Sequence, residues 1–306
     1  MASISIVIPT HNRQKSLQKC LSCLNDQNRL DFVENIYIIN DGHIPVENIC
    51  KMFKNISDYI IILKTNEIGP AAARNEALQL INCKYIAFLD DDSYPLPNWL
   101  SECEKLFEEN PTITAQLGRI LWAREDKSIY FFKSFIPKFR QKIYDYRHQV
   151  YQSDRFINEL INLVKPTVRL NIKGLSNHIS GGNFAIKNSF FAEHGWFNLK
   201  YLTYHDKELA YRILINNGII AYNPEMKVLH KHSSSIIRAI KRAAFTVQFK
   251  LILQKEYKSY KWTSISIKRI NSTKLKLSPA EFAFNILLII IETLTLLYLK
   301  LKTRND

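Results

Sequence analysis

Three consecutive carboxylates, Asp90, Asp91 and Asp92, follow the apolar run of residues 84–89. This run predicts a buried strand that residues 93–95 end, so the three acids are expected at its carboxyl end. Adjacent carboxylates repel one another, and a divalent cation would relieve the repulsion. Hard oxygen ligands suit Mg²⁺ or Mn²⁺, and such an ion would in turn hold a diphosphate. The alternative interpretation is an acidic surface loop.

Alternating strands and helices are predicted around these acids. The predicted strands cover residues 4–8, 35–39, 59–63, 85–89 and 113–122. The predicted helices cover residues 14–24, 46–53, 71–81 and 97–109. Strict β–α alternation indicates an α/β fold with a Rossmann-like, doubly wound, mostly parallel sheet. Ligands of such sheets bind beyond the carboxyl ends of the strands, where polar residues 10–13, 40–42 and 90–92 fall.

Composition and charge narrow the class of protein. A chain of 306 residues with 46% hydrophobic content can bury a sizeable core, which excludes general disorder. The net charge of +14 is concentrated in residues 231–276, where twelve Lys or Arg accompany a single acid, Glu256. A basic segment that leads into an apolar one favours an anionic membrane surface over nucleic acid as the partner.

The cysteines indicate a reducing compartment. Five cysteines are scattered over the first third of the chain, and the first residues do not resemble a signal peptide, so we expect a cytoplasmic protein. Cys20 and Cys23 have the spacing of a zinc or redox pair. They also follow the helical spacing of Leu17 and Leu24, and no second pair exists, so we interpret them as core residues.

Two apolar stretches follow in the last quarter of the chain. Residues 234–255 predict a basic amphipathic helix. Residues 282–301 have the length of a membrane span, but Glu292 would be costly in a bilayer. We therefore favour interfacial helices that hold the protein peripherally on the cytoplasmic face of a membrane. A helix that packs or dimerises, giving a homo-oligomer, and a true span are the alternatives.

Seven motifs in chain order resemble those of the inverting GT-A glycosyltransferases of family 2, over about residues 3–232. The motifs are Ser5–Arg13, Asn40-Asp41-Gly42, Gly69–Asn75, Phe88–Asp92, Ser180–Ile186 with Glu193–Phe197, His205–Arg212, and Val228–His232. Each is weak alone, and their order and spacing carry the resemblance. It implies a GT-A domain at 1–232 with a nucleotide-sugar half at 1–122, a helical insertion at 123–177 and an acceptor half at 178–232. Residues 233–306 would form a helical extension.

The resemblance assigns the opening loop, Pro9, Thr10, His11, Asn12 and Arg13, to the nucleotide. From its turn, Asp41 can offer a carboxylate to the N3–H of uracil or thymine, and the alternative is an ordinary turn residue. Arg74 opens a helix whose N-terminus favours a phosphate or a base. Gly181 and Gly182 would admit the sugar or the diphosphate closely, with Asn183 as a hydrogen-bond partner.

Asp92 is the first choice of metal ligand, with Asp90 as a further ligand and with Asp90 and Asp91 orienting the ribose or binding through water. The resemblance also implies a histidine ligand near the end of the domain. His230 and His232 lie two residues apart on a predicted strand and share one face, so spacing does not choose between them.

Glycosyl transfer with inversion needs a general base. The resemblance places Asp206 in that role, and its alternative is a helix-capping carboxylate. His205 stands where the motif usually has Glu, which leaves the base in place and puts recognition of the acceptor in question. Glu208 and Arg212 are expected to pair along the helix.

Together these features predict a metal-dependent inverting glycosyltransferase. It would move a hexose or aminohexose from a nucleotide diphosphate sugar, UDP being favoured, to a hydroxyl acceptor in polysaccharide, glycolipid or lipid-linked glycan synthesis. The alternatives are a sugar-nucleotide nucleotidyltransferase and a non-catalytic, basic protein that binds membranes or nucleic acid. Against the first alternative, residues 10–13 lack the glycine-rich phosphate loop expected after the first strand.

Overall fold

The computed structural model describes residues 3–122, 141–143, 145–154, 157–158, 173–201, 204–230 and scattered residues of 245–257 and 279–295. The chain divides into two compact units, Met1–Ala123 with His148–Lys231, and Arg124–Arg147 with His232–Asp306. The predicted strands, the carboxylates and the motif helices belong to the first unit. The second unit lies largely outside the described residues, as do most of the predicted helices at 234–255 and 282–301 and most of the insertion at 123–177.

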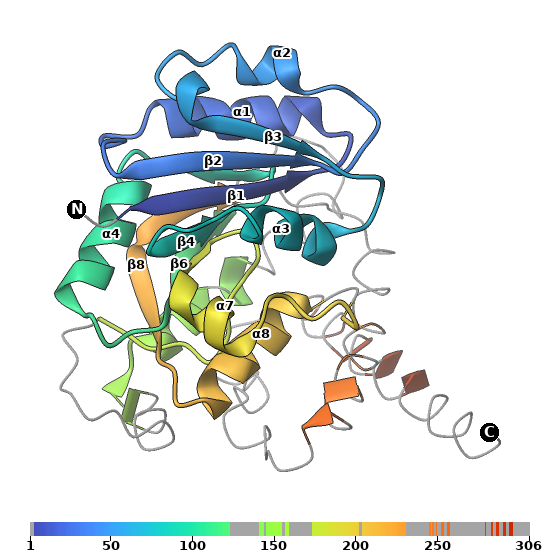
Figure 1. Cartoon of the computed structure of the whole chain (residues 1–306). Helices are drawn as coiled ribbons and strands as arrows, with labels where there is room; N and C mark the ends of the chain where they lie inside the picture. The colour runs from blue at the N-terminus through green and yellow to red at the C-terminus, as the bar shows by residue number, and fades with distance from the viewer. Residues whose placement is uncertain are drawn as a thin grey trace. The chain divides into compact units, whose positions relative to one another are not determined.

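A single eight-stranded sheet forms the centre of the first unit (Figure 1). The strands are β1 Ile4–Thr10, β2 Val33–Asn40, β3 Ile60–Lys64, β4 Tyr85–Phe88, β5 Ser93–Pro95, β6 Ala115–Trp122, β7 Phe184–Lys187 and β8 Ile220–His230. Their order is β3-β2-β1-β4-β7-β6-β8-β5. The pairs β1–β2, β2–β3, β1–β4 and β6–β8 are parallel, while β4–β7, β6–β7 and β5–β8 are antiparallel. The mostly parallel sheet is therefore confirmed, with antiparallel strands added in the second half.

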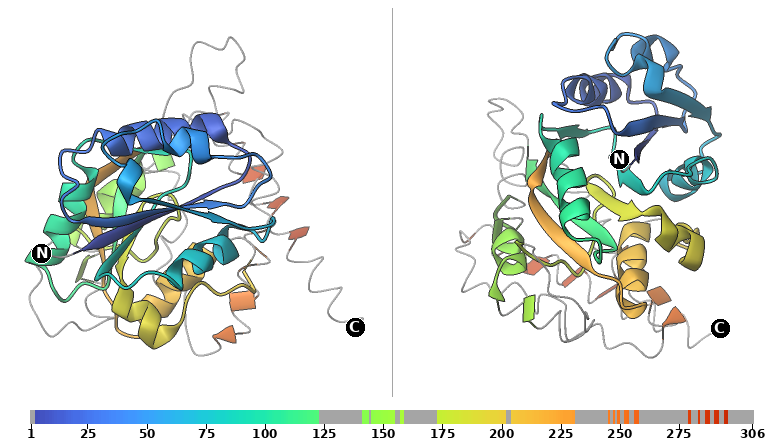
Figure 2. Two further views of the ribbon diagram at one scale, coloured as in Figure 1. Left: turned by 45° about the horizontal axis from the view of Figure 1, so that its top comes forward. Right: turned by 60° about the vertical axis from the view of Figure 1, so that its left-hand side comes forward.

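Helices cover both faces of the parallel strands. The described helices with printed bounds are α1 Gln14–Asn25, α2 Glu47–Cys50, the 3₁₀ turn η1 Ser57–Tyr59, α3 Pro70–Leu78, α4 Trp99–Glu109, α7 Asn188–His194 and α8 His205–Ile215. Figures 1 and 2 show α1 on one side of β1 and β2 and α3 on the other. Residues 141–143 and 145–151 are also helical. This layering brings the carboxyl ends of β1, β2 and β4 to one edge of the sheet.

Successive residues of the central strands are buried almost without interruption, as expected for strands covered on both faces. In β1, Ile6, Val7 and Ile8 are fully buried. Phe88 of β4 stacks on Phe184 of β7 with ring centroids 4.5 Å apart. This contact packs β4 against β7 next to the carboxylates, so it helps to position residues 90–92.

The structure corrects the prediction that residues 93–95 only end a strand. They form β5, which pairs antiparallel with β8 so that Ser93 lies opposite His230. A second difference is the length of α2, predicted at 46–53 and observed at Glu47–Cys50. Cys50 is its only buried residue and Met52 is 57% exposed, so little apolar surface supports a longer helix.

Cys20 lies on the buried face of α1, as the helical spacing predicts. Burial, followed by the charge of Asp91, raises the pKa of its thiol well above the usual value.

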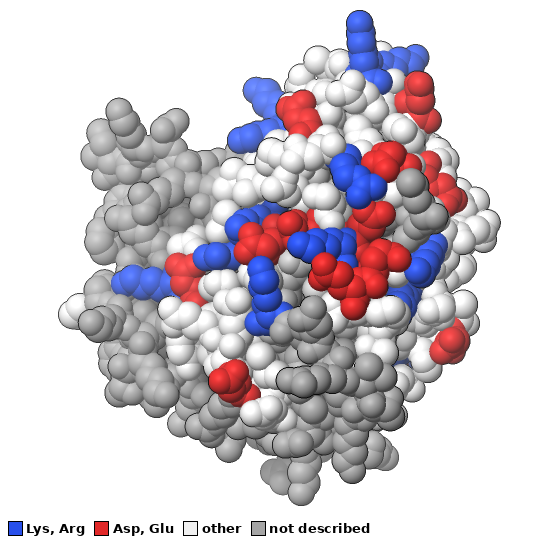
Figure 3. All heavy atoms as spheres, turned by 90° about the vertical axis from the view of Figure 1, so that its left-hand side faces the viewer, with Lys and Arg blue, Asp and Glu red and all other residues white. Residues whose placement is uncertain are grey.

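Within the described part of the chain, no helix is long and apolar enough to cross a membrane. On the face drawn in Figure 3, described Lys and Arg side chains lie among Asp and Glu, so this face is not uniformly basic.

Candidate active site

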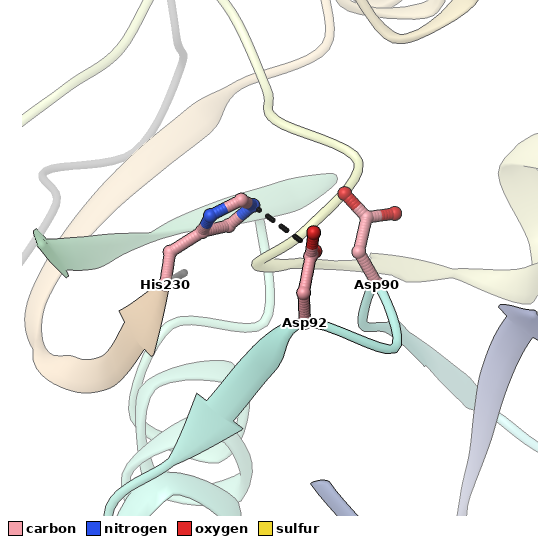
Figure 4. A group of neighbouring side chains, drawn as sticks. All are labelled: Asp90, Asp92 and His230. Carbon is pink, nitrogen blue, oxygen red and sulfur yellow. Dashed lines mark ion pairs between the residues drawn. The ribbon is translucent and has the colours of Figure 1, made fainter. Parts of the chain in front are cut away.

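Two carboxylates and one imidazole meet at the carboxyl edge of the sheet. Asp90 and Asp92 lie in the short segment between β4 and β5, and His230 ends β8. The pairing of β5 with β8 brings His230 beside Asp92, where its Nε2 lies 3.5 Å from Asp92 Oδ1 (Figure 4). One ligand atom from each of the three side chains lies within 4.8 Å of the others.

The residues present fit a divalent cation. Two carboxylate oxygens and an imidazole nitrogen are a donor set suited to Mn²⁺ or Mg²⁺, with the imidazole favouring the softer Mn²⁺. Gly182 lies directly against this group, because a Cβ there would lie 3.0 Å from Asp90 Oδ2 and 3.3 Å from His230 Cδ2. Of the two histidines that spacing left open, the structure places His230 in this group, and His232 lies outside the described residues.

Asp91 is turned away from this group, and here the structure differs from the prediction of a ribose or water-mediated metal contact. Its side chain is 3% exposed and accepts hydrogen bonds from Thr10 Oγ1 at 2.7 Å and Arg13 Nη1 at 2.9 Å. Burial raises the pKa of Asp91 to about 6, and the charge of Arg13 opposes that rise. Asp91 therefore anchors the opening loop of the domain to the metal-site loop.

Arg13 joins the opening loop to the candidate metal site as well. Its Nη1 donates to Asp91 Oδ1 at 2.9 Å and to Asp92 Oδ2 at 2.6 Å, while its side chain remains 52% exposed. Burial lowers the pKa of Arg13, but the two carboxylates outweigh burial and raise it overall. The half-exposed guanidinium thus lies beside Asp92, the first choice of metal ligand.

The rest of the opening loop packs against the turn after β2. His11 Nδ1 lies 2.9 Å from the carbonyl oxygen of Asp41. Asn12 has a positive φ of 54°, and its Oδ1 accepts hydrogen bonds from the backbone N–H groups of His43 and Ile44, both at 3.1 Å. Gly42 is required here, because a Cβ would lie 2.4 Å from Asn12 Oδ1.

Asp41 has a structural role that its sequence pattern did not predict. Its Oδ1 accepts hydrogen bonds from Thr65 Oγ1 at 2.7 Å and from the Ile68 N–H at 2.9 Å, and its Oδ2 accepts one from the Gly69 N–H at 2.9 Å. The carboxylate is nearly buried and shapes the loop that leads into α3. Recognition of a nucleobase by the remaining lone pair of Oδ2 stays a prediction.

Arg74 also differs from its predicted place. The guanidinium was expected to face a phosphate or a base, but the side chain is 2% exposed. Its Nη2 donates to Asp90 Oδ1 at 2.7 Å, and its Nη1 lies 2.9 Å from His205 Nε2. Arg74 therefore binds Asp90, a predicted metal ligand, from the buried side of the site.

Asp206 lies in the first turn of α8, partly exposed. Its Oδ2 accepts a hydrogen bond from the Gly181 N–H at 3.2 Å, and its Oδ1 accepts one from the Lys207 N–H at 2.9 Å. The carbonyl oxygen of Gly181 lies 3.4 Å from Arg74 Nη2. Gly181 thus connects the predicted base with the arginine that supports the metal site.

Asn183 corrects another prediction. Its side chain is fully buried, and its Nδ2 donates to the carbonyl oxygens of Arg119 and Met226 at 3.1 and 2.9 Å. Its Oδ1 accepts a hydrogen bond from Trp99 Nε1 at 2.8 Å. The amide is directed into the core and cross-links α4, β6 and β8, so it does not face a sugar. Pro9 lies within β1 and pairs with β2 opposite Ile39, and its contact with the nucleotide stays a prediction.

The predicted Glu208–Arg212 pair is confirmed, with Arg212 Nε 3.1 Å from Glu208 Oε1. The sequence did not reveal its purpose. Arg212 Nη1 donates to the carbonyl oxygens of His194 and Gly195, both at 2.6 Å, and Nη2 donates to that of Trp196 at 2.7 Å. The pair therefore pins the loop between α7 and α8 to the helix that carries Asp206.

The order and layering of the sheet are those of the GT-A fold. A mannosyltransferase from Pyrobaculum calidifontis, solved with GDP-Man and Mn²⁺, superposes with a TM-score of 0.62 at 14% identity, covering 94% of this chain and 73% of that one. TarS residues 1–349 of S. aureus, solved with UDP-GlcNAc, gives a TM-score of 0.58 at 13% identity, covering 94% and 79%.

The chain belongs to glycosyl transferase family 2, whose profile matches residues 5–193. Chondroitin synthase of Escherichia coli is 27% identical over 241 residues, which cover 72% of this chain and 34% of that protein. The chain spans less than half the length of the curated relatives that it matches. Membership in this family favours glycosyl transfer over the nucleotidyltransferase alternative.

Proposed function

We propose that this chain is a metal-dependent, inverting glycosyltransferase that moves a hexose or aminohexose from a nucleotide diphosphate sugar to a hydroxyl acceptor. The observation that carries the proposal is the convergence of Asp90, Asp92 and His230 within 4.8 Å at the sheet edge. These three residues would hold Mn²⁺ or Mg²⁺. When bound, the cation would stabilise the negative charge of the departing diphosphate.

Arg13 supports the same assignment from the mouth of the site. Its exposed guanidinium lies 2.6 Å from Asp92. Arginine offers several donors in a planar fork that matches phosphate oxygens. The half-exposed guanidinium beside the proposed metal ligands can therefore bind the diphosphate without a movement of the loop that carries it.

Asp206 is the general base of this proposal. It accepts the proton of the acceptor hydroxyl while that oxygen attacks the anomeric carbon and the bond from this carbon to the diphosphate breaks. Attack opposite the leaving group inverts the anomeric configuration. The carboxylate of Asp206 accepts a hydrogen bond from the Gly181 N–H at 3.2 Å. Asp206 also lies in the first turn of α8, where the helix dipole favours negative charge.

UDP is the favoured nucleotide, because the Asp41 carboxylate can accept the N3–H of uracil from its turn. The two structural neighbours leave more than one nucleotide to test, since one was solved with GDP-Man and the other with UDP-GlcNAc. The acceptor is proposed to be a growing polysaccharide, a glycolipid or a lipid-linked glycan.

Calorimetry tests the proposal. UDP, GDP, dTDP and ADP are titrated, each with and without Mn²⁺, into the wild-type protein, into Asp92→Ala and into Asp58→Ala. Asp58 is an exposed acid before the amino end of β3, at the opposite edge of the sheet, so its removal matches the change in charge. We expect Mn²⁺-dependent binding of one diphosphate that Asp92→Ala abolishes and Asp58→Ala retains. Absence of nucleotide binding under every condition would refute the catalytic assignment and favour a non-catalytic protein.

Peripheral binding to an anionic membrane is a second part of the proposal, based on the basic segment 231–276. Electrostatic attraction of this kind falls as salt screens the charges. The full chain should therefore sediment with vesicles that contain phosphatidylserine and not with neutral vesicles, and added salt should release it. Equal sedimentation with both kinds of vesicle would contradict an electrostatic contact.

A further inference from the structure

A buried contact joins α8 to α3 behind the metal site. His205, the first residue of α8, places Nε2 2.9 Å from Arg74 Nη1. Both side chains are buried, and the ring of Phe197 lies against both, 5.5 Å from the imidazole centroid and 5.8 Å from the guanidinium carbon. The contact is shielded from water, so its geometry depends on the two side chains themselves.

The chemistry of the pair fixes the proton on the imidazole. An arginine side chain has only donors, so His205 Nε2 must accept the hydrogen bond. The proton of the neutral ring then lies on Nδ1. Burial, followed by the nearby charge of Arg74, lowers the pKa of His205 to about 4, which agrees with a neutral ring at pH 7. Nδ1 is buried and has no hydrogen-bond partner among the described residues.

An unpaired buried N–H is unfavourable, typically by about 1–3 kcal/mol. The imidazole contributes one polar contact with a described side chain, and that contact is the one with Arg74. The other end of Arg74 donates from Nη2 to Asp90 Oδ1 at 2.7 Å. A continuous path therefore runs from α8 through the guanidinium to a carboxylate of the metal group.

We infer that His205 is a positioning residue: its neutral Nε2 orients Arg74, and Arg74 in turn orients Asp90 for the metal. The inference rests on the proposed function, because it assigns Asp90 to a bound cation. It extends that function to His205, which contacts Arg74 and not the metal group itself. It also ties the helix that carries Asp206 to the loop that carries Asp90.

A neutral partner suits this path better than an acidic one. Arg74 carries one positive charge, and a second carboxylate at position 205 would compete with Asp90 for it. The imidazole accepts a hydrogen bond without adding negative charge, so Arg74 keeps its ion pair with Asp90 at 2.7 Å. Histidine in place of the usual Glu at position 205 therefore leaves the charge of Arg74 available to Asp90.

The test compares two amides at this position. In His205→Gln the side-chain oxygen reaches the place of Nε2 and can accept from Arg74. In His205→Asn the amide is as polar but too short. Mn²⁺ affinity of the full chain is measured by the loss of the free-ion electron paramagnetic resonance signal, without nucleotide. We expect His205→Asn to weaken Mn²⁺ binding about 10-fold or more, the usual effect of losing a residue that orients a ligand, and His205→Gln to stay close to wild type.

Nitrogen-15 NMR of the wild-type imidazole gives a readout that needs neither metal nor a variant that folds. The inference expects a neutral His205 with its proton on Nδ1 at pH 7. A proton on Nε2 would overturn it, and so would equal Mn²⁺ affinity in the Asn and Gln variants. Failure of the wild-type protein to bind Mn²⁺ would instead refute the proposed function, and with it the metal-positioning role.

Discussion

Replacing Gly182 with alanine should damage the metal site through a single methyl group. The new Cβ would lie 2.7 Å from Ser93 Oγ, 3.0 Å from Asp90 Oδ2 and 3.3 Å from His230 Cδ2. Ordinary contacts begin near 3.4 Å, so Asp90 must move by about 0.4 Å. Gly182 does not have a left-handed φ, so the effect is steric and not a backbone effect.

A displacement of this size matters because metal ligands must be held within about 0.5 Å of their working geometry. We expect Gly182→Ala to weaken Mn²⁺ binding by about 10–100-fold, judged from other losses of ligand orientation. Crowding in a packed site should also lower the free energy of unfolding by about 1–3 kcal/mol. Mn²⁺ titration by electron paramagnetic resonance and urea unfolding measure the two effects separately.

Ser93 provides the matched control. Its hydroxyl is buried and has no partner among the described residues, so Ser93→Ala should leave stability nearly unchanged. In the double variant the 2.7 Å overlap with the hydroxyl disappears, while the approaches to Asp90 and His230 remain. The double variant should recover part of the stability and little of the Mn²⁺ affinity. Wild-type Mn²⁺ affinity in Gly182→Ala would refute this account of the site.

Three further predictions concern α8. Asp206→Asn should lower kcat by about 10²–10⁴-fold in a transfer assay, as expected for loss of a general base. Nucleotide binding should stay unchanged. A small loss of kcat would argue against the role of general base. The pKa of His205, lowered from 6.5 to about 4, means that unfolded chains take up a proton between these pH values that the folded protein does not. The stability from this site is therefore complete above pH 6.5 and falls by about 3 kcal/mol towards pH 4, and His205→Gln should remove this part of the pH dependence in urea titrations. Glu208→Ala, which leaves the largely buried Arg212 without its paired charge, should lower the free energy of unfolding by about 3 kcal/mol. A loss under 1 kcal/mol, measured against Glu193→Ala on the exposed surface, would show that Arg212 needs no partner.

Local patterns predicted the first half of the fold well. The strands of β1 to β4 and the helices α1, α3 and α4 appear near their predicted bounds. Hydrophobic periodicity and Pro70 at the start of α3 depend on neighbours in sequence, so a single segment contains the signal. The short strand β5 was missed because three residues have no periodicity of their own, and β5 exists through its pairing with β8.

The residues of the site divide in the same way. The carboxylates after β4 could be found from the sequence because they follow a predicted strand, and the acid in the first turn of α8 was found through the resemblance to family 2. The sequence did not reveal the protein partners of Asp91, Arg74 and Asn183: all three were expected to face a ligand, and the structure buries all three in contacts with other residues. Nothing in the neighbouring sequence signals a partner such as His205, which lies 131 residues from Arg74.

By itself, the sequence determined the alternating elements, the acidic edge of the sheet and the residue types proposed to bind a metal and to accept a proton. The tertiary structure alone decided which of these side chains meet. The register of β5 on β8 sets Ser93 opposite His230, and this register brings the histidine to Asp92. Such contacts depend on distances between segments more than a hundred residues apart, which packing of the whole sheet sets and no local pattern encodes.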